Sequence, residues 1–256
     1  MRLRVFTCAL GVALSAGPVF AQTGFSQAGA RSGQFGFAGF LSVGVERTDW
    51  GGLQDELTRT SFATLPTQRF TIGGGGYALR SHILVGGEAY ASISDPVVSA
   101  TDRQVRALGG GGFMTLGYAL VDRPQARLYP LVGLGGVGVM LDLEDPLGLG
   151  IGPNVNDPQF IDVMVNPGRR SRVSSGSLAL LFGGGAEVLL GRRVNTARRR
   201  ESGLLLGVRG GFTYRAVRSD WMLYDQRITG GPDVTGGGWF VRFTVGAGGT
   251  RWRARG

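Results

Sequence analysis

The chain has 256 residues, of which 47 are glycine and 43% are hydrophobic. Its formal net charge at pH 7 is +9, and it has a single cysteine, Cys8. The glycines lie inside apolar runs and show no collagen repeat, which excludes a collagen-like chain or a disordered glycine-rich polymer. The arginines gather in turns and near the chain end rather than along one face, so we expect no nucleic-acid partner.

Residues 1–21 have the pattern of a secretory signal peptide. Its apolar run is shorter than the roughly 20 residues that a membrane-spanning helix needs, so we predict that the segment is cleaved. The mature chain would then lack a thiol, because Cys8 lies in the leader. Residues 22–33 are small and polar, and we expect a flexible start. The basic start, apolar middle and cleavage site are Arg2 with Arg4, Val5–Ala16 and Val19–Ala21.

Eight later segments alternate apolar residues with small or polar ones at a period of two, which predicts strands with one apolar face. In one of them Leu180, Phe182 and Val188 share a face, and Glu187 lies on the other. Most are long enough for a tilted strand to cross a bilayer, which takes roughly 9–11 residues. The predicted strands are about 34–45, 69–79, 82–94, 104–120, 127–141, 177–190, 203–217 and 237–247.

The connections between these strands alternate in length. Long loops are expected after the odd strands and shorter turns after the even ones, as in outer-membrane barrels with both termini in the periplasm. We expect the longest loop, 142–172, to stand in solvent without regular structure. Strands 104–120 and 127–141 are apolar on both faces, which a β-bulge in their glycine runs would explain. The other predicted long loops are 47–67, 95–103 and 219–236, and the turns are 80–81, 122–125 and 191–202.

Four charged residues lie on the less apolar faces of their strands: Glu88, Glu187, Arg209 and Arg242. A barrel keeps such residues inside, because an arginine facing lipid at mid-depth costs about 2–4 kcal/mol. The interior of an eight-stranded barrel is narrow enough for side chains to fill it. We therefore predict that these four residues pair in a structural lumen network and do not line an open channel.

This arrangement resembles the small eight-stranded outer-membrane β-barrel proteins, of the type of the OmpA-like transmembrane domain, over residues 34–250. The resemblance implies an all-β fold: an eight-stranded antiparallel up-and-down transmembrane β-barrel, preceded by the cleaved signal peptide and followed by a basic tail, 251–256. It also implies a monomer in the cell outer membrane that contacts membrane lipid and, during biogenesis, the barrel-assembly machinery.

Two sets of residues match patterns that occur in cofactor-binding or catalytic sites. Gly133–Gly138 matches GxGxxG, but a strand follows it where a dinucleotide site needs a helix. His82, Glu88 and Ser92 invite a hydrolase interpretation, yet strand positions six apart lie roughly 20 Å from one another. We predict no catalytic residue and no cofactor site.

The loop 142–172 carries both acidic and basic residues. Its acidic residues lack the spacing of a calcium-binding EF-hand loop, so we predict solvated charges and no metal site. Arg169, Arg170 and Arg172 near its end are candidates for contact with lipopolysaccharide phosphates. The acidic residues are Asp142, Glu144, Asp145, Asp157 and Asp162.

We therefore expect a structural or surface-interaction role, such as envelope integrity or loop-mediated contacts, without catalysis. Three alternatives stay open at this point. They are a narrow pore, a barrel lipid hydrolase, and a soluble periplasmic β-barrel that binds an apolar ligand.

Overall fold

The computed structural model describes residues 35–123, 125–148, 159–195, 200–218, 220–224, 226–234 and 238–251. The predicted signal peptide, the predicted flexible segment 22–33 and residues 252–256 of the predicted tail lie outside the described residues.

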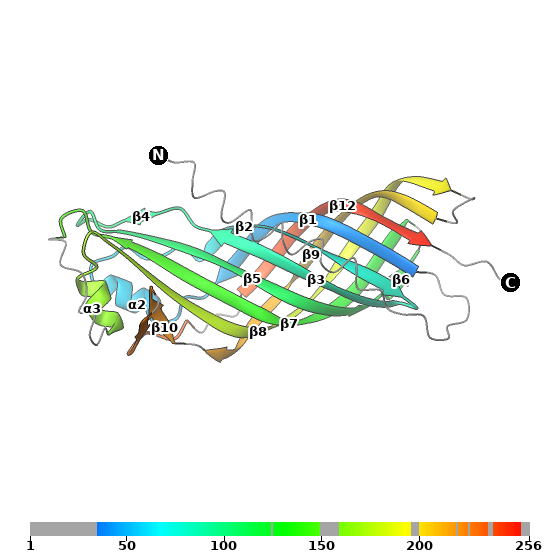
Figure 1. The fold of residues 1–256 in the computed structure, drawn as a ribbon. Helices are drawn as coiled ribbons and strands as arrows, with labels where there is room; N and C mark the ends of the chain where they lie inside the picture. Colours follow the sequence, from blue (N-terminus) through cyan, green and yellow to red (C-terminus); the bar gives the residue numbers. More distant parts are fainter. Residues whose placement is uncertain are drawn as a thin grey trace.

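Eight long antiparallel strands form a closed barrel (Figure 1). Each pairs with the next along the chain, and the last strand returns to pair with the first over its whole length. The predicted fold class, an all-β eight-stranded antiparallel up-and-down barrel, is confirmed. The strands are β1 (Phe35–Thr48), β2 (Gln68–Arg80), β3 (Ile83–Ile93), β5 (Gln104–Tyr118), β7 (Ala126–Glu144), β8 (Arg170–Asn195), β9 (Arg200–Arg218) and β12 (Gly238–Arg251).

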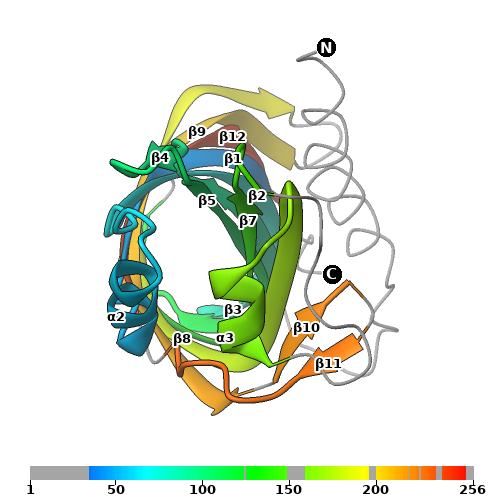
Figure 2. The ribbon, with the colours of Figure 1, turned by 90° about the vertical axis from the view of Figure 1, so that its left-hand side faces the viewer.

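The two ends of the barrel differ. At the turn end, which holds Phe35 and Arg251, β2 and β3 are joined through Ser81 and His82. Both residues have positive φ, 50° and 70°, as a tight hairpin turn requires. The opposite end, the cap end, carries short elements that surround the barrel mouth in Figure 2. These are α2 (Gly52–Arg59), α3 (Phe160–Val165), β4 (Val97–Val98), β10 (Trp221–Leu223) and β11 (Gln226–Ile228), whereas β6 (Val121–Asp122) lies at the turn end.

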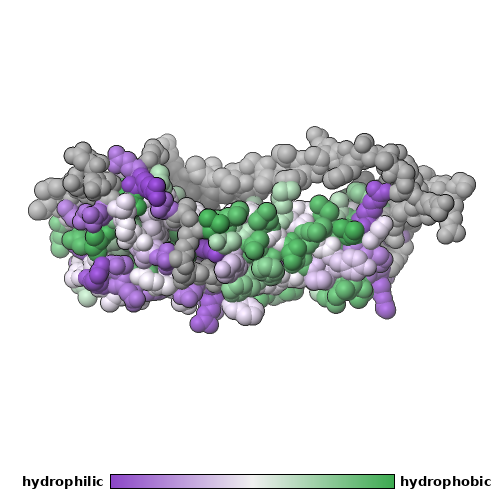
Figure 3. All heavy atoms as spheres, turned by 90° about the horizontal axis from the view of Figure 1, so that it is seen from below, coloured by the Kyte–Doolittle hydropathy of each residue, from purple (hydrophilic) through white to green (hydrophobic). Residues whose placement is uncertain are grey.

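Side chains alternate between the outside and the inside of the wall, with the facing that the sequence pattern predicts. On the outside Leu41 is 62% exposed and Met114 is 65% exposed, whereas inside Ala179 and Leu181 are fully buried. Figure 3 shows hydrophobic residues gathered over the middle of the barrel and strongly hydrophilic ones mostly toward its ends. The barrel thus has an apolar exterior belt, even though part of its interior is charged.

The β7–β8 hairpin is longer than predicted. β7 continues to Glu144 and β8 already begins at Arg170, so residues 142–172 are not one irregular loop in solvent. Their described part includes α3, and residues 47–67 likewise include α2. These helices are stabilised by burial of a few apolar side chains against the barrel mouth, and such short helices leave little periodicity in a sequence. In the same way β4, β10 and β11 lie where only loops were predicted.

The predicted bulge in the strands that are apolar on both faces is wrong. β5 and β7 pair in one continuous register from Gln104 opposite Glu144 to Gly117 opposite Leu131. The inward residues near the cap end are apolar because they form the floor of a hydrophobic core under the helices. The register shifts of the barrel wall occur instead between β8 and β9, at Leu178/Ala179 and Leu190/Arg193.

Candidate functional site

The four charged residues that the sequence placed in the lumen lie together at its centre. Glu88 accepts hydrogen bonds from Arg209 Nη1 at 2.9 Å and from Arg242 Nη1 at 3.1 Å. Arg209 Nη2 also donates to Glu187 at 3.3 Å. The side chains are at most 7% exposed, so two carboxylates and two guanidiniums balance one another away from solvent. The network joins β3, β8, β9 and β12 across the barrel.

Two tyrosines extend this network toward the turn end. Tyr77 and Tyr129 each donate a hydrogen bond from the hydroxyl to Glu187. Arg127 Nη1 donates to the Tyr77 hydroxyl at 2.7 Å, and Arg127 Nε lies 3.3 Å from Asp122 Oδ1. The sequence analysis missed these residues. The sequence signal that could have found the two tyrosines is their place on the inward faces of β2 and β7, because a buried tyrosine hydroxyl needs a hydrogen-bond partner.

Aromatic rings fill the space around the two central guanidiniums. Arg209 lies 4.0 Å from the centroid of the Phe40 ring. Arg242 lies 3.9 Å from the Tyr90 ring and 4.4 Å from the Phe240 ring. Such cation–π contacts gain strength where water is excluded. At this level the lumen is therefore occupied by stacked rings and paired charges.

A second ion pair lies nearer the cap end. Arg69 Nη2 donates to Glu46 and, at 2.9 Å, to Thr48 Oγ1. The guanidinium of Arg69 lies 4.9 Å from the ring of Trp50, which belongs to the cap. This ion pair therefore lies between the polar part of the lumen and the hydrophobic core at the cap end.

We call that core the cap cluster. It closes the mouth of the barrel with apolar side chains from α2, α3, β10, β11 and the cap ends of β5, β7 and β8. Phe160 of α3 packs on Trp221 of β10 with 5.0 Å between ring centroids. The cluster consists of Trp50, Leu53, Leu57, Phe62, Leu65, Val105, Ala107, Val139, Leu141, Leu143, Phe160, Val163, Met164, Val173, Trp221, Leu223, Ile228 and Val234.

Arg103 fastens the segments of the cap to one another. It donates to the carbonyl of Thr60 at 2.8 Å, to the carbonyl of Val165 at 3.1 Å and to Asp145 at 3.1 Å. One guanidinium thus connects the ends of α2 and α3 with the segment after β7. The cap is a folded part of the molecule and not a set of independent loops.

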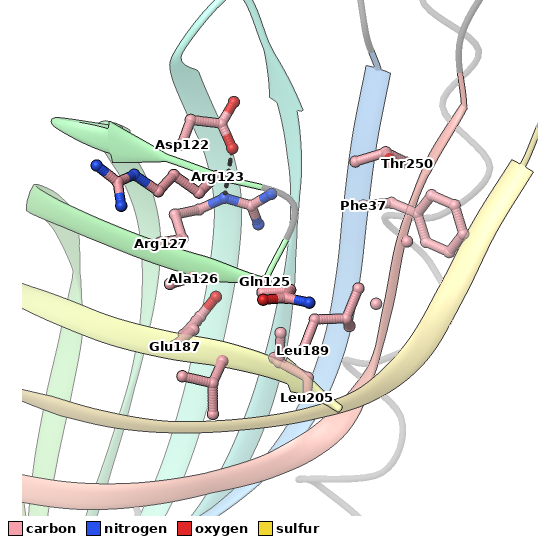
Figure 4. A pocket seen from close by; sticks show the side chains of 13 residues that line it. Phe37, Asp122, Arg123, Gln125, Ala126, Arg127, Glu187, Leu189, Leu205 and Thr250 are labelled. Atoms are coloured by element: carbon pink, nitrogen blue, oxygen red, sulfur yellow. Dashed lines mark hydrogen bonds and ion pairs between the residues drawn. The ribbon is translucent and has the colours of Figure 1, made fainter. Parts of the chain in front are cut away.

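One cavity, of about 70 Å³, lies at the turn end, is lined in part by Glu187 and is drawn in Figure 4, where Arg127 points toward Asp122. A smaller one, of about 20 Å³, lies between the cap cluster and the central charge network and is lined in part by Glu46, Arg69 and Arg215. Both are far smaller than the roughly 300–1,000 Å³ of small-molecule sites.

Of the three arginines predicted to contact lipopolysaccharide, Arg170 and Arg172 lie at the start of β8, near the cap end, and Arg169 directly precedes this strand. Arg172 Nε lies 2.6 Å from Asp142 Oδ1, and Arg170 Nε lies 3.2 Å from Glu144 Oε1. Arg169 is exposed. Two of these three positive charges are therefore already paired with carboxylates of β7.

The residues of the hydrolase interpretation do not meet. His82 is exposed in the β2–β3 turn, Glu88 binds two arginines in the lumen, and Ser92 is 1% exposed further along β3. The GxGxxG stretch, 133–138, lies wholly within β7 and precedes no helix. Among the described residues no group of three or more His, Cys, Asp or Glu side chains is arranged to hold a metal ion. No helix within the described ranges is long and apolar enough to cross a membrane.

No protein-family model matches the chain, and no curated protein matches its sequence. Solved structures with a similar strand arrangement include the attachment invasion locus protein of Yersinia pestis in complex with the heparin analogue sucrose octasulfate. It shares 10% identity and a TM-score of 0.39, over 86% of this chain and 99% of that one.

Two further solved structures are similar to a lesser degree. Neisserial surface protein A shares 10% identity and a TM-score of 0.29, over 85% of this chain and 96% of that one. The outer membrane protease OmpT from Escherichia coli shares 10% identity and a TM-score of 0.28, over 90% and 99%. Likenesses this weak assign neither a family nor an activity.

Proposed function

We propose that this chain is an outer-membrane protein whose barrel is a closed, non-conducting anchor and whose cap presents contact surfaces outside the cell. It has a structural or surface-interaction role and no catalytic one. The observation that carries the proposal is the filled lumen: paired charges, aromatic rings and the cap cluster succeed one another from the turn end to the cap end.

The exterior belt supports the membrane location. Leu41 and Phe243, on the neighbouring strands β1 and β12, and Leu134, on β7 across the barrel, are each more than half exposed. Soluble monomers rarely expose contiguous apolar surface beyond about 300–600 Å², so a belt on the strands around the barrel favours lipid as its solvent. The buried charges of the lumen point the same way, because a soluble barrel places its apolar face inside.

The closed lumen argues against the pore. A conducting path would have to pass Glu88, which accepts hydrogen bonds from Arg209 and Arg242, and aromatic rings whose centroids lie within 4.4 Å of these guanidiniums. It would then have to pass the cap cluster. The small cavities likewise argue against a soluble barrel with an apolar ligand. The separation of His82 from Ser92 argues against the lipid hydrolase.

The distribution of connections supports the orientation. In outer-membrane barrels the short turns face the periplasm and the long connections face outward, which places the cap end outside. Arg169, Arg170 and Arg172 would then lie at the outer boundary of the bilayer. We include contact with lipopolysaccharide phosphates in the proposal, with Arg169 as the residue whose charge is most available.

Single-cysteine labelling tests the location and the orientation together. The predicted mature chain contains no cysteine, because Cys8 lies in the leader. Leu147→Cys places a thiol on a residue that is 78% exposed at the cap end. Arg123→Cys places one on an exposed residue at the turn end. The two variants form a matched pair.

A membrane-impermeant maleimide should label Leu147→Cys on intact cells and Arg123→Cys only after the outer membrane is permeabilised. Both variants should stay in the membrane fraction after a urea wash. Recovery of the protein in the periplasmic soluble fraction would refute the proposal in favour of the soluble barrel. If Arg123→Cys alone were labelled on intact cells, the turn end would face outward, opposite to the proposed orientation.

A further inference from the structure

The small cavity between the cap cluster and the central network has an unusual charge balance. Two guanidiniums border it, those of Arg69 and Arg215, but only one carboxylate does, that of Glu46. Glu46 is already paired with Arg69. Among the described residues Arg215 forms no ion pair, and it donates a hydrogen bond to the carbonyl of Val234 at 3.4 Å.

At the neighbouring level of the lumen, by contrast, the positive and negative charges are equal in number. There Arg209 and Arg242 face Glu88 and Glu187, so two cations meet two anions. A charge withdrawn from water is strongly unfavourable unless an opposite charge accompanies it. The level around Arg69, which is buried, and Arg215, which is partly buried, therefore carries one more positive than negative charge.

Hydrogen-bond donors without a partner occur on Arg69, which lines the cavity, and on two buried residues outside its lining. Arg69 has a side chain that is only 4% exposed, yet its Nε and Nη1 atoms have no partner in the described residues. The hydroxyls of Ser92 and Thr71, 1% and 0% exposed, also lack one. Such buried unpaired groups are rare in native proteins and call for an explanation.

We propose that the lumen binds one chloride ion at this level, held by Arg69 and Arg215, which both line the cavity. The cavity of about 20 Å³ has room for a small occupant, since a water molecule needs about 10–15 Å³. Chloride supplies the missing negative charge, which a water molecule does not. This inference is independent of whether the barrel has a surface-interaction role.

Bromide substitution tests the proposal directly. Crystals grown in sodium bromide should show an anomalous-scattering peak in this cavity in the wild-type protein. The peak should vanish in Arg215→Gln, which removes the unpaired charge and leaves the Glu46–Arg69 pair, and it should persist in Arg215→Lys. A cavity without a bromide peak in the wild type, or a peak that survives in Arg215→Gln, would overturn the assignment.

Unfolding kinetics give a second readout in solution. If the ion must leave before the barrel opens, unfolding in urea should be about threefold slower in sodium chloride than in sodium gluconate, when chloride is present at twice its dissociation constant. The control Arg172→Gln, on the outside of the wall, should keep this dependence, and Arg215→Gln should lose it. Equal unfolding rates of the wild type in both salts at saturating concentration would refute the site.

Discussion

Removal of Glu88 should destabilise the barrel more than removal of any exposed carboxylate. Glu88→Ala would leave Arg209 and Arg242, 6% and 4% exposed, without the carboxylate that bridges them. Two unit charges about 4 Å apart interact by about 4 kcal/mol at an effective dielectric constant of 20. Breaking a buried pair from one side typically costs about 3–5 kcal/mol. We expect a loss of unfolding free energy in that range.

The matched control is Glu144→Ala, which breaks the pair with Arg170. Those side chains are 38% and 58% exposed, and pairs of this kind contribute about 0–1 kcal/mol. Both variants should be unfolded with urea in lipid vesicles and followed by tryptophan fluorescence. Adding Arg242→Met to Glu88→Ala should recover part of the stability, because it removes one orphaned cation. If Glu88→Ala is as mild as Glu144→Ala, the description of the lumen network is wrong.

Three further perturbations test the cap, the wall and the belt. Phe160→Ala, at a residue 1% exposed, should destabilise the cap by about 3–5 kcal/mol and expose it to protease, whereas Val165→Ala, 54% exposed, should change stability by less than about 0.5 kcal/mol. Gly135→Ala should lower the folded fraction on an unheated gel, because its Cβ would lie 1.9 Å from the Gly112 carbonyl oxygen. Gly136→Ala, with its nearest neighbour 3.8 Å away, should not. Val241→Arg should reduce membrane insertion, at a cost of about 2–4 kcal/mol for an arginine near mid-depth. If Phe160→Ala and Val165→Ala behave alike, or Gly135→Ala and Gly136→Ala do, the description of the cap or of the wall is wrong. Normal insertion of Val241→Arg would contradict the lipid-facing belt.

The barrel could be predicted because the alternation of residues within each wall strand shows which side chains point outward and which point inward. Alternation along β8 places Phe182 outside and Glu187 inside without reference to any other strand. The number of strands follows from counting such segments. The placement of Glu88, Glu187, Arg209 and Arg242 on inward faces follows by the same rule.

The cap could not be predicted, because its elements are short and depend on tertiary contacts. α3 has only six residues, and its burial depends on Trp221, some sixty residues away in the sequence. The apolar second face of β7 was visible, but its cause was not, since Leu141 and Leu143 are buried by segments that a local pattern shows only as loops. The unpaired charge of Arg215 also emerges only when three strands are brought together.

The claim that this barrel is closed is tested most directly by planar-bilayer recording of the purified wild-type protein. The paired charges, the rings around Arg209 and Arg242, and the cap cluster together predict little or no conductance. The double variant Arg209→Ala with Arg242→Ala should conduct more than the wild type, because it loosens the filling of the lumen. Stable, large channels in the wild-type protein would contradict the closed lumen and establish a pore in its place.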